Sequence, residues 1–312
     1  MRRGVSGPGV GGFRHEAVFY RGLDDLVAAT VPFIIEGLDR REPVLVAVLP
    51  DRIRRLRSAL GRAADRVAFL DLEWVGRNPA RIIPVWRRFV RESGSAGPVR
   101  GIGEPVWSGR SEVEFEECSL HESLLNVAFD DGPAWRLVCP YDVDALPRDV
   151  VQDVMRTHPY LGSAAGVHLE YAGHRYASDG FASKLTPAPA SANEAPFQDD
   201  LSRLRAVLRT WALDAGLSHR RAADLALAVH ELATNSMTHG GGEGVLRGWR
   251  ESESFVVEVS DTGRIGDPLV GRDVVPDSAE GGRGLWLVNQ LCDLVQVRSL
   301  ETGTVVRLHS RL

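Results

Sequence analysis

The sequence has very little lysine. Lys184 is its single lysine, and arginine supplies the rest of the 37 basic residues. A P-loop site needs a lysine on the nucleotide phosphates, and the chain has no Gly-Lys-Ser or Gly-Lys-Thr. This absence argues against a Walker-type ATPase and against an ordinary eukaryotic-type protein kinase. The use of arginine in place of lysine is itself typical of proteins encoded by a GC-rich genome.

Cysteine is also scarce. The three cysteines, Cys118, Cys139 and Cys292, are far apart, odd in number and form no CxxC motif. A disulfide scaffold and a zinc ribbon are therefore not indicated, and a reducing cytoplasm is the expected setting.

Long apolar runs and an excess of positive charge are missing too. No apolar run approaches the roughly 20 residues of a membrane helix. The Gly-rich first twelve residues lack the apolar segment of a signal peptide. The net charge of −5 argues against direct nucleic-acid binding, which requires a basic surface. We expect a cytoplasmic protein without a membrane partner, and the 312 residues suggest two domains.

Strand-like and helix-like segments alternate through the first 150 residues or so. Pro43–Leu49 is a continuous apolar run, typical of a strand buried on both faces, and Pro79–Ser93 has helical spacing. This alternation predicts an α/β domain with a mostly parallel sheet and helices on both faces.

Ligands of such sheets bind outside the carboxyl ends of the strands. Glu104 interrupts an apolar strand there and is the strongest candidate. Asp71 and Asp142 have an ordinary alternative as helix caps or turn formers. The ordinary alternative for Cys139 is an inert buried thiol, and the ordinary alternative for His158 is a turn residue. The candidate sensory site comprises Glu104, Trp107, Cys139, Tyr141 and His158.

The motifs of this first domain resemble a known family. HEAVFY, GIGEPVW, the Glu122–Asn126 part of HESLLN, CPYD and THP occur in the order found in the MEDS sensory domain. The resemblance covers roughly Arg14–Tyr171. It implies a RecA-like core without a working P-loop, which senses an unspecified signal and carries out no chemistry. We place this domain at residues 13–175.

Residues 176–198 are rich in Pro, Ala and Ser without a period, so we expect a linker. Residues 199–312 then show two amphipathic helices, a glycine loop, two strands, a polar stretch, a short helix and a final hairpin. This order predicts an α+β two-layer sandwich, with helices on one face of a mixed sheet.

Three segments of the second domain combine polar groups with glycine. Glu231 and Asn235 in HELATNSMTHG share one face of a helix, because they are four residues apart. Asp261 ends a strand and is followed by Gly263, which lets a flat base approach the backbone. The turn Gly281–Gly284 opens an apolar helix, a geometry suited to phosphate. Each segment alone has an ordinary reading: a solvated face, a turn, or a helix start.

Together, the three segments resemble the N, G1 and G2 boxes of GHKL (Bergerat-fold) ATPases, and more narrowly the bacterial anti-sigma-factor serine kinases. The resemblance implies that Glu231 is the general base, that Asn235 binds Mg²⁺ and that Asp261 binds adenine. It implies that Thr304 lies close to the adenine. His239 follows Asn235 by one helical turn, so we expect it at the rim of the same pocket. The remaining nucleotide-binding residues that the resemblance implies are Gly263, Gly266, Gly282, Arg283 and Gly284.

The sequence departs from that pattern at the second box. Arg264 and Ile265 are bulky, although Gly266 follows them. Residues Arg264–Glu280 are expected to form a lid over the nucleotide. Arg272 or Arg283 would supply the positive charge that lysine cannot.

The expected function is an ATP- and Mg²⁺-dependent serine kinase of an anti-sigma factor antagonist, controlled by the first domain and acting in transcription regulation and stress signalling. The expected partners are that antagonist, a sigma factor, or both, and a homodimer stays open. One alternative is an ATP-binding module that binds the same partners without catalysis. Another is a sensor histidine kinase, for which His219 and His230 are the candidate acceptors.

Overall fold

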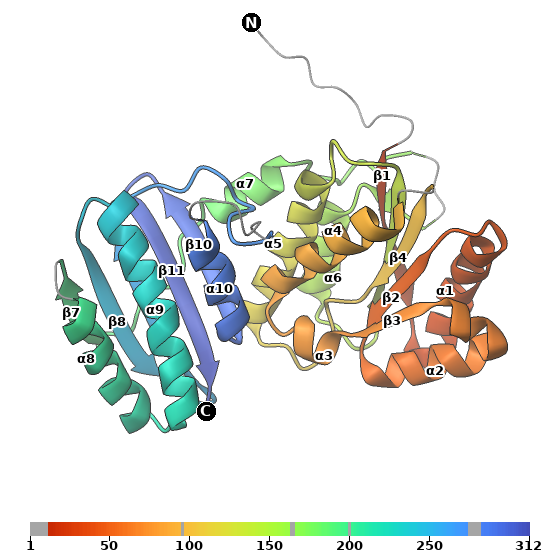
Figure 1. Cartoon of the computed structure of the whole chain (residues 1–312). Helices are drawn as coiled ribbons and strands as arrows, with labels where there is room; N and C mark the ends of the chain where they lie inside the picture. The colour runs from red at the N-terminus through yellow and green to blue at the C-terminus, as the bar shows by residue number, and fades with distance from the viewer. Residues whose placement is uncertain (1–11, 95–96, 163–165, 199–200, 274–281) are drawn as a thin grey trace, which may run out of the picture. The chain divides into compact units, whose positions relative to one another are not determined.

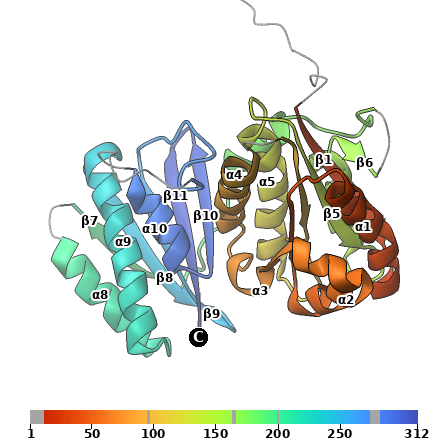
Figure 2. The ribbon, with the colours of Figure 1, turned by 45° about the vertical axis from the view of Figure 1, so that its right-hand side comes forward.

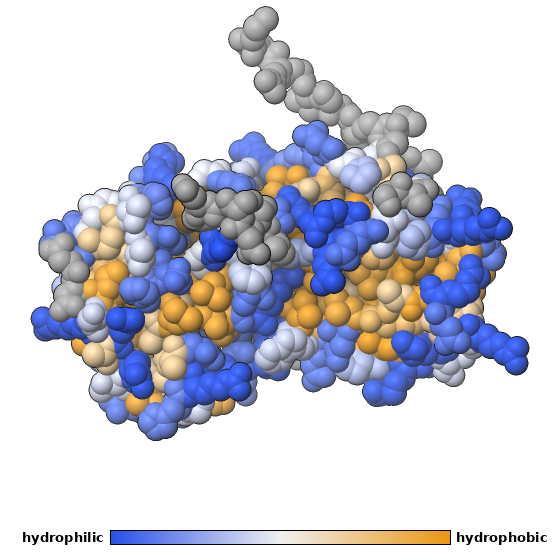
Figure 3. All heavy atoms as spheres, viewed as in Figure 1, coloured by the Kyte–Doolittle hydropathy of each residue, from blue (hydrophilic) through white to orange (hydrophobic). Residues whose placement is uncertain are grey.

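A computed structural model of the chain describes residues 12–94, 97–162, 166–198, 201–273 and 282–312 (Figure 1). Contacts divide the chain into two compact units, Met1–Gly76 with Val85–Tyr176 and Arg77–Pro84 with Ala177–Leu312. In the part of the chain that the structure describes, no helix combines the length and the apolar character needed to cross a membrane. On the face drawn in Figure 3, each unit shows hydrophilic side chains around apolar patches.

The first unit is built on a parallel sheet, as the alternation predicts. Its strands lie in the order β3-β2-β4-β5-β1-β6, and every pair between them is parallel. The strands are β1 (Phe13–Tyr20), β2 (Val44–Val48), β3 (Ala68–Asp71), β4 (Val99–Gly103), β5 (Trp135–Asp142) and β6 (Tyr160–Leu161).

Helices cover both faces of this sheet (Figures 1 and 2). On one face, α1 (Gly22–Asp39) and α2 (Pro50–Leu60) pack their apolar side chains on β2, and on Ile102 and Val138 of the neighbouring strands. On the other face lie α4 (Ile82–Ser93) and α5 (Glu112–Ala128). The remaining elements of this unit are α3 (Leu72–Val75), α6 (Arg148–Thr157) and the 3₁₀ turn η1 (Gly61–Arg66). The 3₁₀ turn η2 (Pro79–Arg81) and all but the first two residues of α7 (Arg175–Phe181) belong to the second unit.

The second unit is a two-layer sandwich. Its sheet has the order β10-β11-β9-β8-β7, and α8 (Leu201–Asp214), α9 (His219–His239) and α10 (Arg283–Leu291) cover one face. Apolar side chains of the three helices meet Val257, Val259 and Leu308 of the sheet in one core. The strands are β7 (Asn193–Phe197), β8 (Gly244–Arg250), β9 (Ser254–Asp261), β10 (Leu294–Leu300) and β11 (Gly303–Arg311).

The second sheet differs from the expected mixed sheet, because every pair in it is antiparallel. The chain crosses from β9 through α10 to β10, which would make a parallel pair if the two strands were neighbours. Strand β11 lies between them and is antiparallel to both. The sheet also begins earlier than expected, since β7 lies in the segment 176–198 and pairs with β8.

A close approach across the first sheet gives a test of its packing. A Cβ atom on Gly101 of β4 would lie 2.8 Å from the Trp86 ring and 2.9 Å from Leu137 Cδ1. Trp86 is 1% exposed, so its rigid ring has little room to move. We predict that Gly101→Ala lowers the free energy of unfolding by about 1–3 kcal/mol through overpacking.

The measurement is urea unfolding followed by tryptophan fluorescence. Gly166→Ala is the matched control, because nothing lies within 4 Å of its added Cβ. Equal midpoints for Gly101→Ala and the control would show that this contact is not tight in solution.

Candidate functional site

Helix α9 carries the first of the three sequence segments. Ser218 caps its start by accepting a hydrogen bond from the backbone N–H of Arg221 at 3.3 Å. The buried stripe of the helix packs on the sheet. This packing leaves Glu231 half-buried and Asn235 exposed on the opposite side, one turn apart, as their spacing predicts. The stripe comprises Ala222, Leu225, Ala226, Ala228, Val229, Leu232, Ala233 and Ser236.

Asp261 lies at the end of β9 and is held by two hydrogen bonds. Ser236 Oγ donates to its Oδ2 at 2.6 Å, and the backbone N–H of Gly263 donates to its Oδ1 at 2.8 Å. Each carboxylate oxygen keeps a further acceptor position, since an ionised carboxylate has about four. Asp261 is therefore oriented from two sides and can still accept a hydrogen bond from a ligand.

Glycines let the end of α9 approach this carboxylate. A Cβ atom on Gly240 would lie 2.6 Å from Asp261 Cγ, and one on Gly263 would lie 2.7 Å from the Cα of Gly240. Thr262 closes the contact, because its Oγ1 and its backbone N–H both donate to the Gly240 carbonyl. Any larger side chain at these two glycines would separate the strand end from the helix.

The glycine turn brings the start of α10 to the same place. Gly282 caps the helix with φ +81°, a backbone conformation that favours glycine. A Cβ atom on Gly284 would lie 3.1 Å from Glu231 Oε2 and 3.3 Å from Asn235 Nδ2. The first turn of α10, with its unsatisfied backbone N–H groups, therefore lies directly against the polar pair of α9.

These segments enclose a cavity of ≈ 210 Å³. Of the expected nucleotide-binding residues, it is lined by Asn235, His239, Asp261, Gly263, Gly282, Gly284 and Thr304. Thr304 is held in place because its Oγ1 donates to the Gly263 carbonyl at 2.9 Å. The cavity lining does not include Glu231, Gly266 or Arg283. Glu231 lies behind the lining, beside Gly284.

Some contributors to this site were not assigned to it from the sequence. Ser236 has the spacing of a core residue, and only the fold shows that its hydroxyl reaches Asp261. Val270 and Leu285 add apolar lining. Of the expected lid Arg264–Glu280, residues 274–280 lie outside the described part of the chain, as does Gly281 of the glycine turn.

A larger hollow of ≈ 780 Å³ adjoins the cavity, and Asp261 and Thr304 line both. Its other walls come from the sheet, including Arg247 and Glu258. No helix start contributes to its lining among the described residues. The smaller cavity therefore fits phosphate groups better.

In the first unit, the structure separates the candidate sensory residues. Tyr20 donates its hydroxyl to Glu104 Oε1 at 2.5 Å, and Arg52 Nε lies 2.8 Å from Glu104 Oε2. The Trp107 ring packs on the Arg110 guanidinium instead, 3.5 Å from the ring centre. Asp71 caps α3 and Asp142 accepts from the N–H of Asp144, which are the ordinary roles weighed for them.

The other three sensory candidates lie together with two further residues. Tyr141 Oη is 3.3 Å from His158 Nε2, and Cys139 Sγ is 3.3 Å from His15 Nε2. Both imidazoles face the Glu122 carboxylate. His15 and Glu122 belong to the HEAVFY and HESLLN motifs of the sequence.

Burial makes Glu104 sensitive to pH. It raises the pKa of Glu104 from 4.5 to about 7, against the opposing effects of Arg52 and Tyr20. The folded chain thus holds this proton at a higher pH than the unfolded chain does. The resulting stabilisation is complete below pH 4.5 and is lost as pH rises through about 7, by about 3 kcal/mol in total.

We predict that the wild-type free energy of unfolding falls more between pH 5 and pH 8 than that of Glu104→Gln. Urea unfolding at the two pH values measures it. Glu92→Gln, an exposed carboxylate in α4, should behave as wild type. An equal change in the free energy of unfolding between the two pH values for wild type and Glu104→Gln would show that Glu104 does not hold a proton in the folded chain.

Comparison with known proteins assigns both units to families. Residues 14–159 match the family described as MEDS, the methanogen/methylotroph DcmR sensory domain. Residues 196–310 match the family described as the histidine kinase-like ATPase domain. Among curated proteins, none matches the chain.

One similar solved structure contains the RsbU and RsbW domains of a Mycobacterium tuberculosis protein, at 16% identity and a TM-score of 0.29. The match covers 66% of this chain and 49% of that chain, so it spans about half the length of the solved protein. The two family matches therefore place a MEDS domain in the N-terminal part of the chain and a histidine kinase-like ATPase domain in its C-terminal part.

Proposed function

We propose that the C-terminal domain is a serine kinase, which uses ATP and Mg²⁺ to phosphorylate an anti-sigma factor antagonist in the cytoplasm, under the control of the MEDS domain. The observation that carries the proposal is the contact of Gly284 with Glu231 and Asn235. It brings a carboxylate, an amide and the start of a helix to one point, and these are the groups that phosphoryl transfer needs.

ATP would bind with its adenine at Asp261. The exocyclic amine of adenine donates hydrogen bonds, and Asp261 has acceptor positions that Ser236 and Gly263 leave unused. The close contact between Gly240 and Gly263 leaves this wall of the cavity without side chains. A flat ring can therefore lie close to the backbone.

The phosphates would then extend to the start of α10. Its first N–H groups and the positive end of its dipole favour anions, and Gly282 and Gly284 keep side chains away from that end. Asn235 faces the same space and would supply an amide oxygen to Mg²⁺, which prefers oxygen ligands. Mg²⁺ would neutralise charge on the phosphates during transfer.

Glu231 would act as the general base. Its Oε2 approaches Gly284, so it lies beside the expected phosphate position without occupying it. It would accept the proton of the serine hydroxyl, while the serine oxygen forms a bond to the γ-phosphorus and the bond to the β-phosphate oxygen breaks. ADP and phosphoserine are the products.

The nucleotide site is tested by Asp261→Asn. This change removes the charge and replaces one acceptor oxygen by an NH₂ group, which cannot accept a hydrogen bond from the adenine amine. A hydrogen bond to a charged group contributes about 1.5–3 kcal/mol. We predict a Kd for ATP raised about 10- to 100-fold, measured by calorimetry. Asp214→Asn, an exposed change on α8, should bind as wild type does. Unchanged binding by Asp261→Asn would place the adenine elsewhere.

The kinase activity is tested by Glu231→Gln. The chain is incubated with γ-labelled ATP, Mg²⁺ and a candidate anti-sigma factor antagonist. Loss of a general base should lower the rate of transfer about 10²- to 10⁴-fold while the Kd for ATP is unchanged. Glu253→Gln, an exposed carboxylate between β8 and β9, is the matched control.

The product distinguishes the alternatives. Acid-stable phosphoserine on the antagonist supports the proposal. Tight ATP binding without transfer to the antagonist would favour a non-catalytic binding module. Acid-labile label on the chain itself would indicate a histidine kinase. Equal rates of phosphoryl transfer in wild type and Glu231→Gln would show that Glu231 is not the general base.

A further inference from the structure

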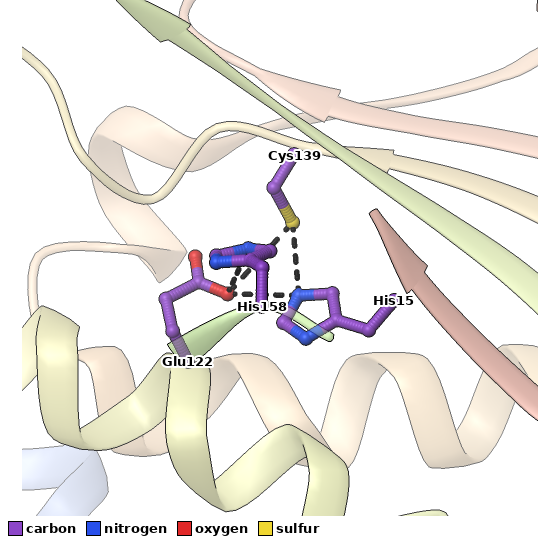
Figure 4. A group of neighbouring side chains, drawn as sticks. All are labelled: His15, Glu122, Cys139 and His158. Atoms are coloured by element: carbon purple, nitrogen blue, oxygen red, sulfur yellow. Dashed lines mark hydrogen bonds and ion pairs between the residues drawn. The ribbon is translucent and has the colours of Figure 1, made fainter. Parts of the chain in front are cut away.

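Four ligating side chains converge inside the MEDS domain, and none of them belongs to the proposed kinase site. They are His15, Glu122, Cys139 and His158, and each is at most 1% exposed (Figure 4). His15 comes from β1 and Cys139 from β5, which pair in parallel with Ala17 opposite Cys139. His15 points to the same face as Ala17, because side chains two apart share a face.

The four ligand atoms lie close enough together to surround one metal ion. Glu122 Oε2 lies 3.0 Å from His15 Nε2, 3.4 Å from His158 Nε2 and 3.8 Å from Cys139 Sγ. His15 Nε2 lies 3.3 Å from Cys139 Sγ, and all four atoms lie within 4.8 Å of one another. Tetrahedral Zn²⁺, with its bonds to N, O and S, separates its ligand atoms by about 3.3–3.8 Å.

Neighbouring groups fix the orientation of the His15 ring. Asn126 donates from Nδ2 to the carbonyls of Glu122 and Thr157 at 3.3 and 2.8 Å. Its Oδ1 must therefore face His15 Nδ1, at 3.1 Å, and accept a proton from it. The neutral ring then directs the lone pair of Nε2 toward the other three ligands. Such an outer hydrogen bond is characteristic of metal-bound histidine.

The His158 ring is oriented in the same way. Its Nδ1 lies 3.1 Å from the carbonyl oxygen of Val154, which can only accept. Nδ1 is therefore the donor, and the lone pair of Nε2 faces Glu122. Two ring lone pairs thus point at one carboxylate oxygen in a fully buried position. Without a proton or a cation between them, these groups repel one another.

Charge and ligand type point to one class of cation. A thiolate, a carboxylate and two neutral imidazoles carry a charge of −2, which a divalent cation cancels, so the buried group becomes neutral. Nitrogen and sulfur ligands in a tetrahedron favour zinc over magnesium or calcium. Four protein ligands leave no open position, as in structural rather than catalytic zinc sites.

We propose that His15, Glu122, Cys139 and His158 bind a structural Zn²⁺ ion that ties β1, α5, β5 and the end of α6 together. This inference is independent of the proposed kinase function. A metal-free network is the competing account: the Tyr141 hydroxyl would donate to His158 Nε2, and a proton would stand between His15 and Glu122.

The test measures metal content in the full chain. Wild type, Cys139→Ser and Cys118→Ser are purified from zinc-supplemented cells, dialysed against metal-free buffer and analysed by elemental mass spectrometry. Cys118 is the matched control, because it is another buried free thiol of the same unit and lies outside the cluster. We expect one zinc per chain in wild type and Cys118→Ser, and at least a tenfold loss in Cys139→Ser.

Cobalt substitution provides a second test that does not depend on the folding of Cys139→Ser. Wild-type chain stripped of metal and reloaded with Co²⁺ should show the intense visible bands of a tetrahedral ion and a thiolate charge-transfer band in the near ultraviolet. Cys118→Ser should show the same spectrum. Wild type that binds neither zinc nor cobalt, zinc retained by folded Cys139→Ser, or a cobalt spectrum without the thiolate band would each overturn the proposal.

Discussion

The hydrogen bond from Ser236 to Asp261 is the interaction on which the proposed nucleotide cavity depends. It joins the last turn of α9 to the end of β9 and orients the carboxylate on the cavity wall. The helix and the strand end can meet only because Gly240 and Gly263 have no side chains at the contact. With this contact fixed, Thr304 of β11 and the start of α10 complete the cavity.

The two domains handle polar groups in different ways. In the ATPase domain, Asn235, Asp261 and Thr304 line an open cavity, where a ligand can use them. In the MEDS domain, ionisable groups are buried beside one another, as Glu104 is beside Tyr20 and Arg52. A buried cluster of this kind is costly unless every charge has a partner. This requirement is why the group around Glu122 indicates a cation.

Much of this architecture can be predicted from local patterns. The alternation of apolar segments gives the parallel sheet, and the spacing of Glu231 and Asn235 gives their shared helix face. Asp71 and Asp142 have the turn and capping roles that their positions suggest. Motifs that lie within one element or one turn report on local geometry, so they are readable without a structure.

What could not be predicted depends on contacts between distant segments. The antiparallel second sheet follows from β11 lying between β9 and β10, which no local pattern encodes. Strand β7 carries a proline and lies on the sheet edge, so it resembles a linker in sequence. His15 and Cys139 are 124 residues apart and meet only through the pairing of β1 with β5.

The central claim is that α9, the end of β9 and the start of α10 form one nucleotide site. A crystal structure of the chain with a non-hydrolysable ATP analogue and Mg²⁺ tests it most directly. The account predicts the adenine amine on Asp261, the metal on Asn235 and the phosphates against the backbone of Gly282 and Gly284. Nucleotide bound instead in the larger hollow beside Arg247 and Glu258, or phosphates away from α10, would contradict it.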